Sequence, residues 1–168
     1  YRNLEYDLET DYIIIGGGSA GCVLANRLSA DPKVRVTLVE AGGEDWNPLI
    51  HIPAGYIKTM VNPSINWMFT AKLDDRTGQR SIAMPRGKVL GGSSAINAML
   101  YVRGQAEDYD GWEARGNVGW SYSDVLPYFK KSENCRVALI RSTDIGQFRG
   151  TSGPLVVNSI RSTYPVLD

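Results

Sequence analysis

The sequence predicts an α/β fold that begins with a β-α-β unit and continues as a parallel sheet. Two apolar runs rich in β-branched residues, 11–15 and 34–40, have the length and composition of strands. Residues 19–28 between them place small and apolar side chains on one helical face. A single β-α-β unit provides two parallel strands, and a stable sheet needs several strands covered on both faces. The predicted fold is therefore incomplete in this chain.

The next segments predict short and irregular elements. Residues 44–79 contain three prolines and no regular periodicity, so loops and short helical turns are expected. Residues 80–84 are compatible with a short strand. A short helix is expected to start at Ser93 and to run through Asn97 and Met99, with first-turn amides available to an anion.

Two longer helices are expected after this point. Residues 105–115 predict a polar surface helix with Tyr109 and Trp112 facing inward, and glycines at 116–119 end it. Residues 121–124 match a capping box at the start of the second helix.

The second helix should bury an apolar face, and the segment after it should be largely irregular. Pro127 is expected in the first turn, where its missing N–H is not needed. Residues 135–153 predict an irregular connection, and residues 154–157 predict a strand. The expected buried residues of the helix are Val125, Leu126, Tyr128 and Phe129.

Composition excludes several classes of function. The 168 residues include 18 Lys plus Arg and 18 Asp plus Glu, a balance that argues against nucleic-acid binding or a polybasic membrane patch. No apolar run approaches the roughly 20 residues of a membrane-spanning helix. Cys22 and Cys135 match neither a disulfide framework nor a metal signature, and no metal is expected. The single histidine, His51, lies between aliphatic residues and is interpreted as a packed, hydrogen-bonded structural residue.

The location of the protein is open from these features. The chain starts without Met or a signal-like stretch, so we expect a processed protein or a piece of a longer one. A cytoplasmic or peripherally membrane-associated location is favoured.

The glycines after the first strand predict a dinucleotide site. Gly16, Gly18 and Gly21 form G-x-G-x-x-G between a strand and a helix, the arrangement of a Rossmann-like fold. The first glycine permits the sharp turn, the second lets a pyrophosphate approach the backbone, and the third lets the helix pack closely. Glu40 lies 19 positions after Gly21, close to the spacing of the acid that binds ribose hydroxyls. An acid there disfavours NADP and leaves NAD and FAD open.

A second glycine-rich segment, residues 86–97, adds hydroxyl groups and a helix start. It has the composition expected of a second wall around a long cofactor. A glycine-rich structural loop without a ligand is the alternative interpretation.

Three motifs together resemble the glucose-methanol-choline (GMC) flavoprotein oxidoreductases. They are residues 11–21, 85–99 and 101–104. The likeness is greatest to the branch of bacterial choline dehydrogenases and aliphatic alcohol dehydrogenases, and it extends from residue 11 to about residue 157. Segments 108–110, 119–120 and 126–131 continue it.

The resemblance implies an FAD-binding domain and an oxidoreductase that transfers hydride from the carbinol carbon of a small-molecule alcohol to flavin N5. It implies the N-terminal part of the FAD-binding domain in residues 1–151 and the start of a substrate-binding domain in residues 152–168. Trp67 and Arg86 are the weaker members of the implied cofactor site, since each could simply pack. The implied cofactor-binding residues are Gly16, Gly18, Ser19, Ala20, Gly21, Glu40, Ala41, Trp67, Arg86, Gly91, Gly92, Ser93, Asn97, Ala98, Met99 and Val102.

Two departures from the family pattern qualify the resemblance. Some members attach FAD through a histidine at the position of Ile96, so non-covalent FAD is expected here. The catalytic histidine of the family lies in the C-terminal part of a longer chain, and His51 does not match it. No catalytic residue is therefore expected within these residues, and the remainder of the polypeptide or a complementary chain is expected to supply it.

Three alternatives remain open at this point. A flavin-containing hydroxynitrile lyase would share the fold and keep FAD without using it for redox chemistry. A non-catalytic FAD-binding half would need a partner chain. A nicotinamide-only enzyme would leave the second glycine motif unexplained. The identity of the alcohol, the electron acceptor and the oligomeric state do not follow from the sequence.

Overall fold

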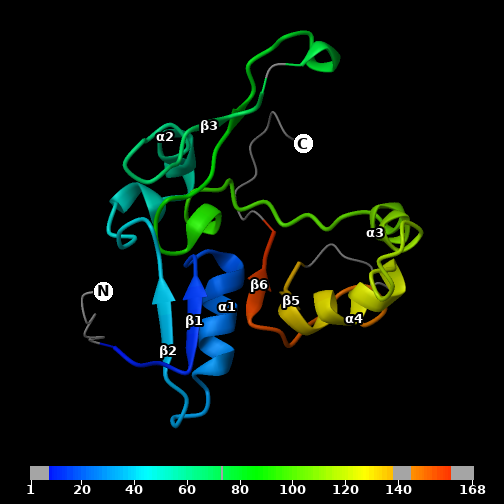
Figure 1. The fold of residues 1–168 in the computed structure, drawn as a ribbon. Coiled ribbons are helices and arrows are strands. Elements are labelled where there is room, and N and C mark those ends of the chain that lie inside the picture. The colour runs from blue at the N-terminus through cyan, green and yellow to red at the C-terminus, as the bar shows by residue number, and fades with distance from the viewer. Residues whose placement is uncertain (1–7, 73, 138–144, 160–168) are drawn as a thin grey trace, which may run out of the picture. The chain divides into compact units, whose positions relative to one another are not determined.

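The computed structural model describes residues 8–72, 74–137 and 145–159. The chain divides into two compact units, Tyr1–Leu100 and Tyr101–Asp168 (Figure 1). These units do not test the predicted boundary between residues 151 and 152, which stays a prediction.

The first unit opens with the predicted β-α-β arrangement. Strand β1 (Tyr12–Ile15) leads into helix α1 (Ser19–Leu28), which returns to strand β2 (Val36–Val39). The two strands are parallel, with Tyr12 opposite Val36 and Ile15 opposite Val39, and α1 lies beside them (Figure 1). The Gly16 amide continues the ladder by donating to the Val39 carbonyl at 2.7 Å. The carboxyl ends of both strands therefore meet at the glycine-rich turn.

Strands β1 and β2 are less buried than the strands of a parallel sheet that is covered on both faces. Ile14 is 8% exposed, whereas Ile13 is 64% and Ile15 is 80% exposed. Helix α1 is the element that packs extensively on both strands, and much of the apolar surface of the sheet stays uncovered by the described residues. A parallel sheet covered on both faces would bury these side chains.

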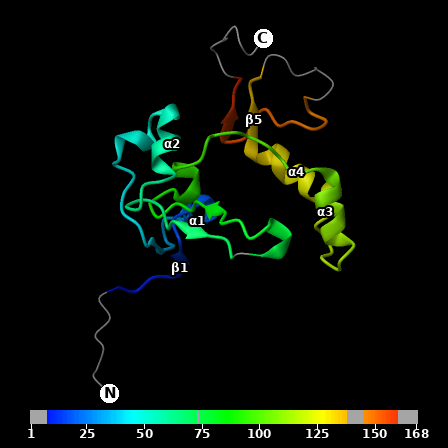
Figure 2. The same cartoon turned by 90° about the horizontal axis from the view of Figure 1, so that it is seen from above.

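Residues 44–79 form short turns, as predicted. They contain the 3₁₀ turns η1 (Pro48–Ile50), η2 (Pro53–Gly55) and η3 (Asp75–Thr77), and the short helix α2 (Tyr56–Thr59). Figure 1 shows α2 beyond the carboxyl ends of β1 and β2, and in Figures 1 and 2 the later part of the segment projects away from these strands.

A short hairpin follows α2. Strand β3 (Phe69–Thr70) pairs antiparallel with β4 (Ala83–Met84). The second strand falls within the predicted range 80–84, and the first was not predicted because it lies in the segment 44–79, which has no regular periodicity.

The second glycine cluster contains the 3₁₀ turn η4 (Gly92–Ala95). The predicted helix through Met99 is wrong, since the turn ends at Ala95 and Met99 has a left-handed φ of +57°. The Asn97 side-chain oxygen accepts the Met99 amide at 2.9 Å, and this local bond competes with a helical one. The small apolar core of the unit lies around this turn and consists of Ile65, Val89 and Ile96.

The second unit contains two helices and a parallel strand pair. The helices are α3 (Ala106–Glu113) and α4 (Tyr122–Ser132), close to the predicted ranges. The predicted capping box is present, because the Ser121 hydroxyl accepts the Asp124 amide at 3.2 Å and the Asp124 carboxylate accepts the Ser121 amide at 3.2 Å.

Strand β5 (Glu133–Cys135) directly follows α4 and pairs in parallel with β6 (Leu155–Val157). The predicted strand at 154–157 is confirmed. Strand β5 was missed, since it follows the helix without a turn residue and carries two polar residues.

Aromatic rings join the two helices of this unit. Tyr109 contacts the rings of Trp112 and Phe129 at centroid distances of 5.4 and 5.6 Å. The inward orientation of Tyr109 is confirmed, although Trp112 remains 43% exposed. Tyr128 is 71% exposed, so its predicted burial is wrong. Pro127 lies inside α4 beyond the first turn, because the helix starts at Tyr122.

No helix in the described part of the chain is long and apolar enough to cross a membrane. Among the same residues, no three His, Cys, Asp or Glu side chains are grouped so that they could hold a metal ion.

Candidate functional site

The turn between β1 and α1 leaves the start of the helix open. Gly16 has a φ of +97°, which allows the sharp turn that the sequence predicts. Gly18 is the N-cap, no side chain caps the helix, and its first turn contains no acidic residue. The amides of Ser19, Ala20 and Gly21 have no partner one helical turn earlier, and they lie at the positive end of the helix dipole. This end of α1 is suited to an anion.

Glycine is required at position 21, where the helix meets the turn, and glycine at position 18 leaves space where a ligand would approach. A Cβ on Gly21 would overlap the carbonyl oxygen of Gly16, so the helix could not pack this closely with any larger residue. A Cβ on Gly18 would come no nearer to another residue than 4.0 Å, from the Gly92 Cα. The two glycines thus behave as the motif predicts, one in packing and the other beside open space.

Glu40 joins the ends of the two strands. Its Oε2 accepts the Gly17 amide at 2.7 Å, and its Oε1 accepts the Gly42 amide at 2.8 Å. A carboxylate oxygen has two lone pairs, so both oxygens keep acceptor capacity for hydroxyl groups of a ligand. Gly42 was not predicted as a site residue; a Cβ there would overlap the Lys88 carbonyl. Its position two residues after the acid is the sequence signal that could have identified it.

The second glycine cluster lies directly against the first. The Gly91 amide donates to the Gly17 carbonyl at 2.7 Å, and the Leu90 amide donates to the Gly43 carbonyl at 2.9 Å. Gly92 has a φ of +57°, and a Cβ on it would lie 2.8 Å from the Gly18 Cα. The segments around residues 17, 42 and 91 therefore form one backbone-lined cradle at the carboxyl end of the sheet, here called the glycine cradle. Gly17, which was also missed, connects all three through its amide and its carbonyl.

Trp67 and Arg86 are neighbours on the hairpin. The Trp67 amide donates to the Arg86 carbonyl at 2.9 Å. The Trp67 ring stacks on Phe69 with centroids 5.8 Å apart, and the Lys88 ammonium lies 4.9 Å from its centre. The Arg86 guanidinium donates to the Pro85 carbonyl at 2.7 Å. The Trp67 ring thus packs between Phe69 and Lys88, Arg86 is exposed with a local hydrogen bond, and the role of both toward a cofactor stays a prediction.

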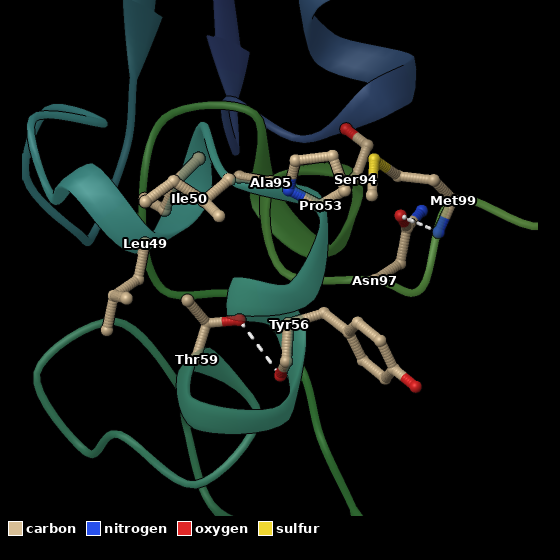
Figure 3. A pocket seen from close by; sticks show the side chains of 10 residues that line it. Leu49, Ile50, Pro53, Tyr56, Thr59, Ser94, Ala95, Asn97 and Met99 are labelled. Atoms are coloured by element: carbon tan, nitrogen blue, oxygen red, sulfur yellow. Dashed lines mark hydrogen bonds between the residues drawn. The ribbon is translucent and has the colours of Figure 1, made fainter. Parts of the chain in front are cut away.

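Asn97 and Met99 line a small cavity together with Ser94 and Tyr56 (Figure 3). The cavity has a volume of about 20 Å³, which is room for a single water molecule. It is too small for a substrate. Ala98 is half-buried and adjoins this group in the chain.

The remaining predicted residues are more dispersed. The Ser93 hydroxyl accepts the Gly87 amide at 3.1 Å, within the second cluster. Ala41 is exposed beside Glu40. Val102 is 85% exposed and belongs to the second unit, so its place at the cofactor stays a prediction. His51 is hydrogen-bonded through Nε2 to the Asp45 carbonyl at 2.8 Å, as predicted, but its side chain is exposed and not packed.

Comparisons with known proteins identify the family to which the chain belongs. The family model for GMC oxidoreductase matches residues 10–166. The chain is 47% identical over 156 residues to an alcohol dehydrogenase (acceptor) from Pseudomonas putida, covering 93% of this chain and 27% of that protein. It is 46% identical over 159 residues to an oxygen-dependent choline dehydrogenase from Rhizobium etli, covering 95% of this chain and 28% of that protein.

Solved structures show the same likeness. Pyridoxine 4-oxidase from Mesorbium loti matches with a TM-score of 0.75 and 36% identity, over 88% of this chain and 28% of that chain. An FAD-dependent oxidoreductase from Chaetomium thermophilum matches with a TM-score of 0.73 and 33% identity, over 95% of this chain and 28% of that chain. The chain thus spans little more than a quarter of the length of these relatives.

Proposed function

Because the chain belongs to the GMC oxidoreductase family, we propose that it is the N-terminal, FAD-binding part of an enzyme that oxidises the CH–OH group of an alcohol. The observation that carries this proposal is the direct contact of the two glycine clusters around an open helix start, with the Gly91 amide on the Gly17 carbonyl at 2.7 Å. The relatives named as alcohol and choline dehydrogenases support an alcohol as the substrate.

The residues of the glycine cradle fit an extended dinucleotide. The free amides of Ser19, Ala20 and Gly21 would bind the pyrophosphate, and the missing Cβ of Gly18 would let it approach the backbone. Glu40 would accept hydrogen bonds from the adenosine ribose, while it holds the turn through its bonds to Gly17 and Gly42. The turn at 91–93 would form the second wall. When bound, FAD would supply the acceptor for hydride from the carbinol carbon at its N5 atom.

The same reasoning supports non-covalent attachment. Ile96 stands at the position where some family members carry the histidine that attaches the flavin. Here its hydrocarbon side chain is 2% exposed and packs in the core with Ile65 and Val89. It has no nucleophilic atom and cannot form that bond.

The proposal assigns no catalytic base to these 168 residues. Family members carry that histidine in the C-terminal part of the chain, so the remainder of the polypeptide or a complementary chain would supply it. Asn97, Ala98, Met99 and Val102 would lie toward the flavin. The cytoplasmic or peripherally membrane-associated location also remains a proposal.

Absorption spectroscopy tests this function. The purified protein should show flavin bands, and after denaturation and removal of the polypeptide these bands should stay in the supernatant. Bands that remain with the polypeptide would contradict non-covalent binding. Protein that neither contains FAD nor takes it up would contradict the cofactor assignment.

Anaerobic titration of the holoprotein with alcohols, including choline, tests the reaction itself. An oxidoreductase should bleach its flavin with a suitable alcohol. A flavin that stays oxidised with every alcohol while the protein cleaves a cyanohydrin would favour the lyase. A flavin that stays oxidised without any turnover would favour a non-catalytic binding half.

A further inference from the structure

Asn66 is a buried polar residue to which neither the sequence pattern nor the proposed function assigns a role. It is 2% exposed, and its side chain makes three hydrogen bonds. Its Nδ2 donates to the Met60 carbonyl at 2.6 Å. Its Oδ1 accepts the Met68 amide at 2.9 Å and the Arg86 amide at 3.0 Å. One amide group thus joins three separate stretches of backbone.

The bond to the Arg86 amide leads directly to the second glycine cluster. Asn66 and Gly87 form an antiparallel bridge, and the adjacent Lys88 amide donates to the Ile65 carbonyl at 2.8 Å. The Gly87 amide donates to the Ser93 hydroxyl at 3.1 Å. A Cβ on Gly87 would overlap the carbonyl oxygen of Gly92, so residues 87 and 92 are in close backbone contact.

The chain of contacts ends at the first glycine cluster. Gly92 lies against the Gly18 Cα, and Gly91 is hydrogen-bonded to the Gly17 carbonyl. A shift of residues 86–87 would therefore be transmitted by backbone contacts to the wall of the cradle. Flexible side chains, which could absorb the shift, contribute little to this route.

We propose that Asn66 is a positioning residue for FAD: through the Arg86 and Gly87 backbone it holds the turn at residues 91–93 at the distance from Gly18 that the cofactor requires. This inference rests on the proposed function, because it assumes FAD in the glycine cradle. Asn66 itself does not touch the cofactor. A buried amide whose oxygen and nitrogen both have hydrogen-bond partners favours one geometry, which is the usual role of a supporting residue behind a binding site.

Two substitutions of Asn66 separate the contribution of its acceptor oxygen from that of its donor nitrogen. Asn66→Ala removes the acceptor and the donor together, and we expect the Kd for FAD to rise by about tenfold or more, as misplaced binding groups do. Asn66→Asp keeps the acceptor oxygen but faces the Met60 carbonyl with a second oxygen. We expect this variant to lose thermal stability while its Kd for FAD stays within about threefold of wild type, because the bond to the Arg86 amide is retained.

Asn62 provides the matched control. Its side-chain oxygen accepts the Ser64 amide at 3.0 Å in the same loop, and none of its side-chain bonds reaches residues 86–93. Asn62→Ala should lower stability through the lost turn and leave the Kd for FAD within about twofold of wild type.

The measurements are FAD titration of the deflavinated full protein and hydrogen exchange of residues 87–93 without FAD. Asn66→Ala should accelerate exchange in this segment, and Asn62→Ala should not. A folded Asn66→Ala variant with wild-type FAD affinity would overturn the proposal. If that variant does not fold, an Asn66→Asp variant that folds but binds FAD at least tenfold more weakly than wild type would overturn it instead.

The exchange data also separate this inference from the proposed function. Wild-type protein that binds no FAD would contradict the proposed function. Faster exchange of residues 87–93 in Asn66→Ala would then still confirm the link from Asn66 to the glycine cluster, and unchanged exchange in that variant would refute it.

Discussion

The glycine cradle of the first unit and the buried charges of the second unit stabilise their surroundings in opposite ways. The cradle is joined by backbone hydrogen bonds and by contacts that only glycine permits, with Glu40 as its one charged member. In the second unit the carboxylate of Glu133 is fully buried and paired with Arg103 and Arg149. A site for an anion must keep its amides and its positive helix end available. In the Glu133 cluster the charged side chains instead pair with one another.

The charged cluster is enclosed by further partners. Glu133 Oε2 accepts hydrogen bonds from Arg103 and from the Gly150 amide, whereas Oε1 is 3.1 Å from Arg149 but has no partner in hydrogen-bond geometry. The Arg103 guanidinium donates to the Phe148 carbonyl at 2.5 Å and lies 5.1 Å from the centre of the Phe129 ring. Glu133 thus connects the segment around residue 103 with β5 and the loop at 148–150.

The largest effect is expected from breaking this cluster. Glu133→Gln would remove the negative charge and leave two arginines largely buried without it, which should lower the free energy of unfolding by about 3–5 kcal/mol. Urea unfolding followed by circular dichroism measures the loss. Glu107→Gln, at an exposed position in the first turn of α3, is the control and should cost less than about 1 kcal/mol. Equal losses in the free energy of unfolding of both variants would show that the buried cluster contributes no more to stability than an exposed charge.

A smaller effect is expected from overpacking the cradle. Gly21→Ala would place a Cβ on the Gly16 carbonyl and should cost about 3 kcal/mol, because the helix must move off the turn. The same movement should weaken FAD binding, which titration detects. Gly43→Ala is the matched control, since a Cβ there meets nothing within 4 Å and its backbone is not left-handed. If both variants bind FAD equally well, close packing at residue 21 does not control the site.

The two regions also differ in how far the sequence predicts them. The cradle has a local signature: a strand, three spaced glycines, a helix and an acid after the next strand, all of which the structure confirms as elements in contact. Glu133 carries no such signature, since its partners lie 30 residues earlier and 16 residues later in the chain. Asn66 was missed for the same reason, because its bond to Arg86 spans 20 residues. The helix predicted through Met99 failed because the Asn97 side chain binds a backbone amide locally.

An intermediate effect within the cradle would come from Glu40→Gln. The variant keeps one acceptor oxygen but turns an amide N–H₂ toward either the Gly17 or the Gly42 amide, which are both donors. The variant also lacks the charge that strengthens the proposed hydrogen bond from the ribose. The loss of this charge-assisted bond should cost about 1.5 kcal/mol in FAD affinity, close to a tenfold rise in Kd. Fluorescence titration with FAD measures it. An unchanged Kd would mean that Glu40 holds the turn alone and makes no contact with the ribose.

The smallest effect is expected from an exposed ion pair of the first unit, which has the same chemistry as the Glu133 cluster without its burial. Asp74 caps the turn η3 and accepts bonds from the Arg76 guanidinium at 3.0 Å and from the Arg76 amide at 2.8 Å. The Arg76 side chain, and then its amide, lower the pKa of Asp74 below its ordinary value of 3.8. A carboxyl with a lowered pKa in the folded state stabilises the protein above that ordinary value, and the contribution is lost as the pH falls through the folded pKa.

Asp74→Asn should therefore be slightly less stable than wild type at pH 7, and the two proteins should converge as the pH falls below 3.8. Urea midpoints of both proteins, measured across this range, give the difference directly and cancel the titration of the other carboxylates. The gap should also shrink with added salt, because water and ions screen an exposed pair. A stability difference that widens on acidification would contradict the assigned direction of the pKa shift. A difference as large as that caused by Glu133→Gln would show that burial is not what makes the Glu133 cluster more important for stability than this exposed ion pair.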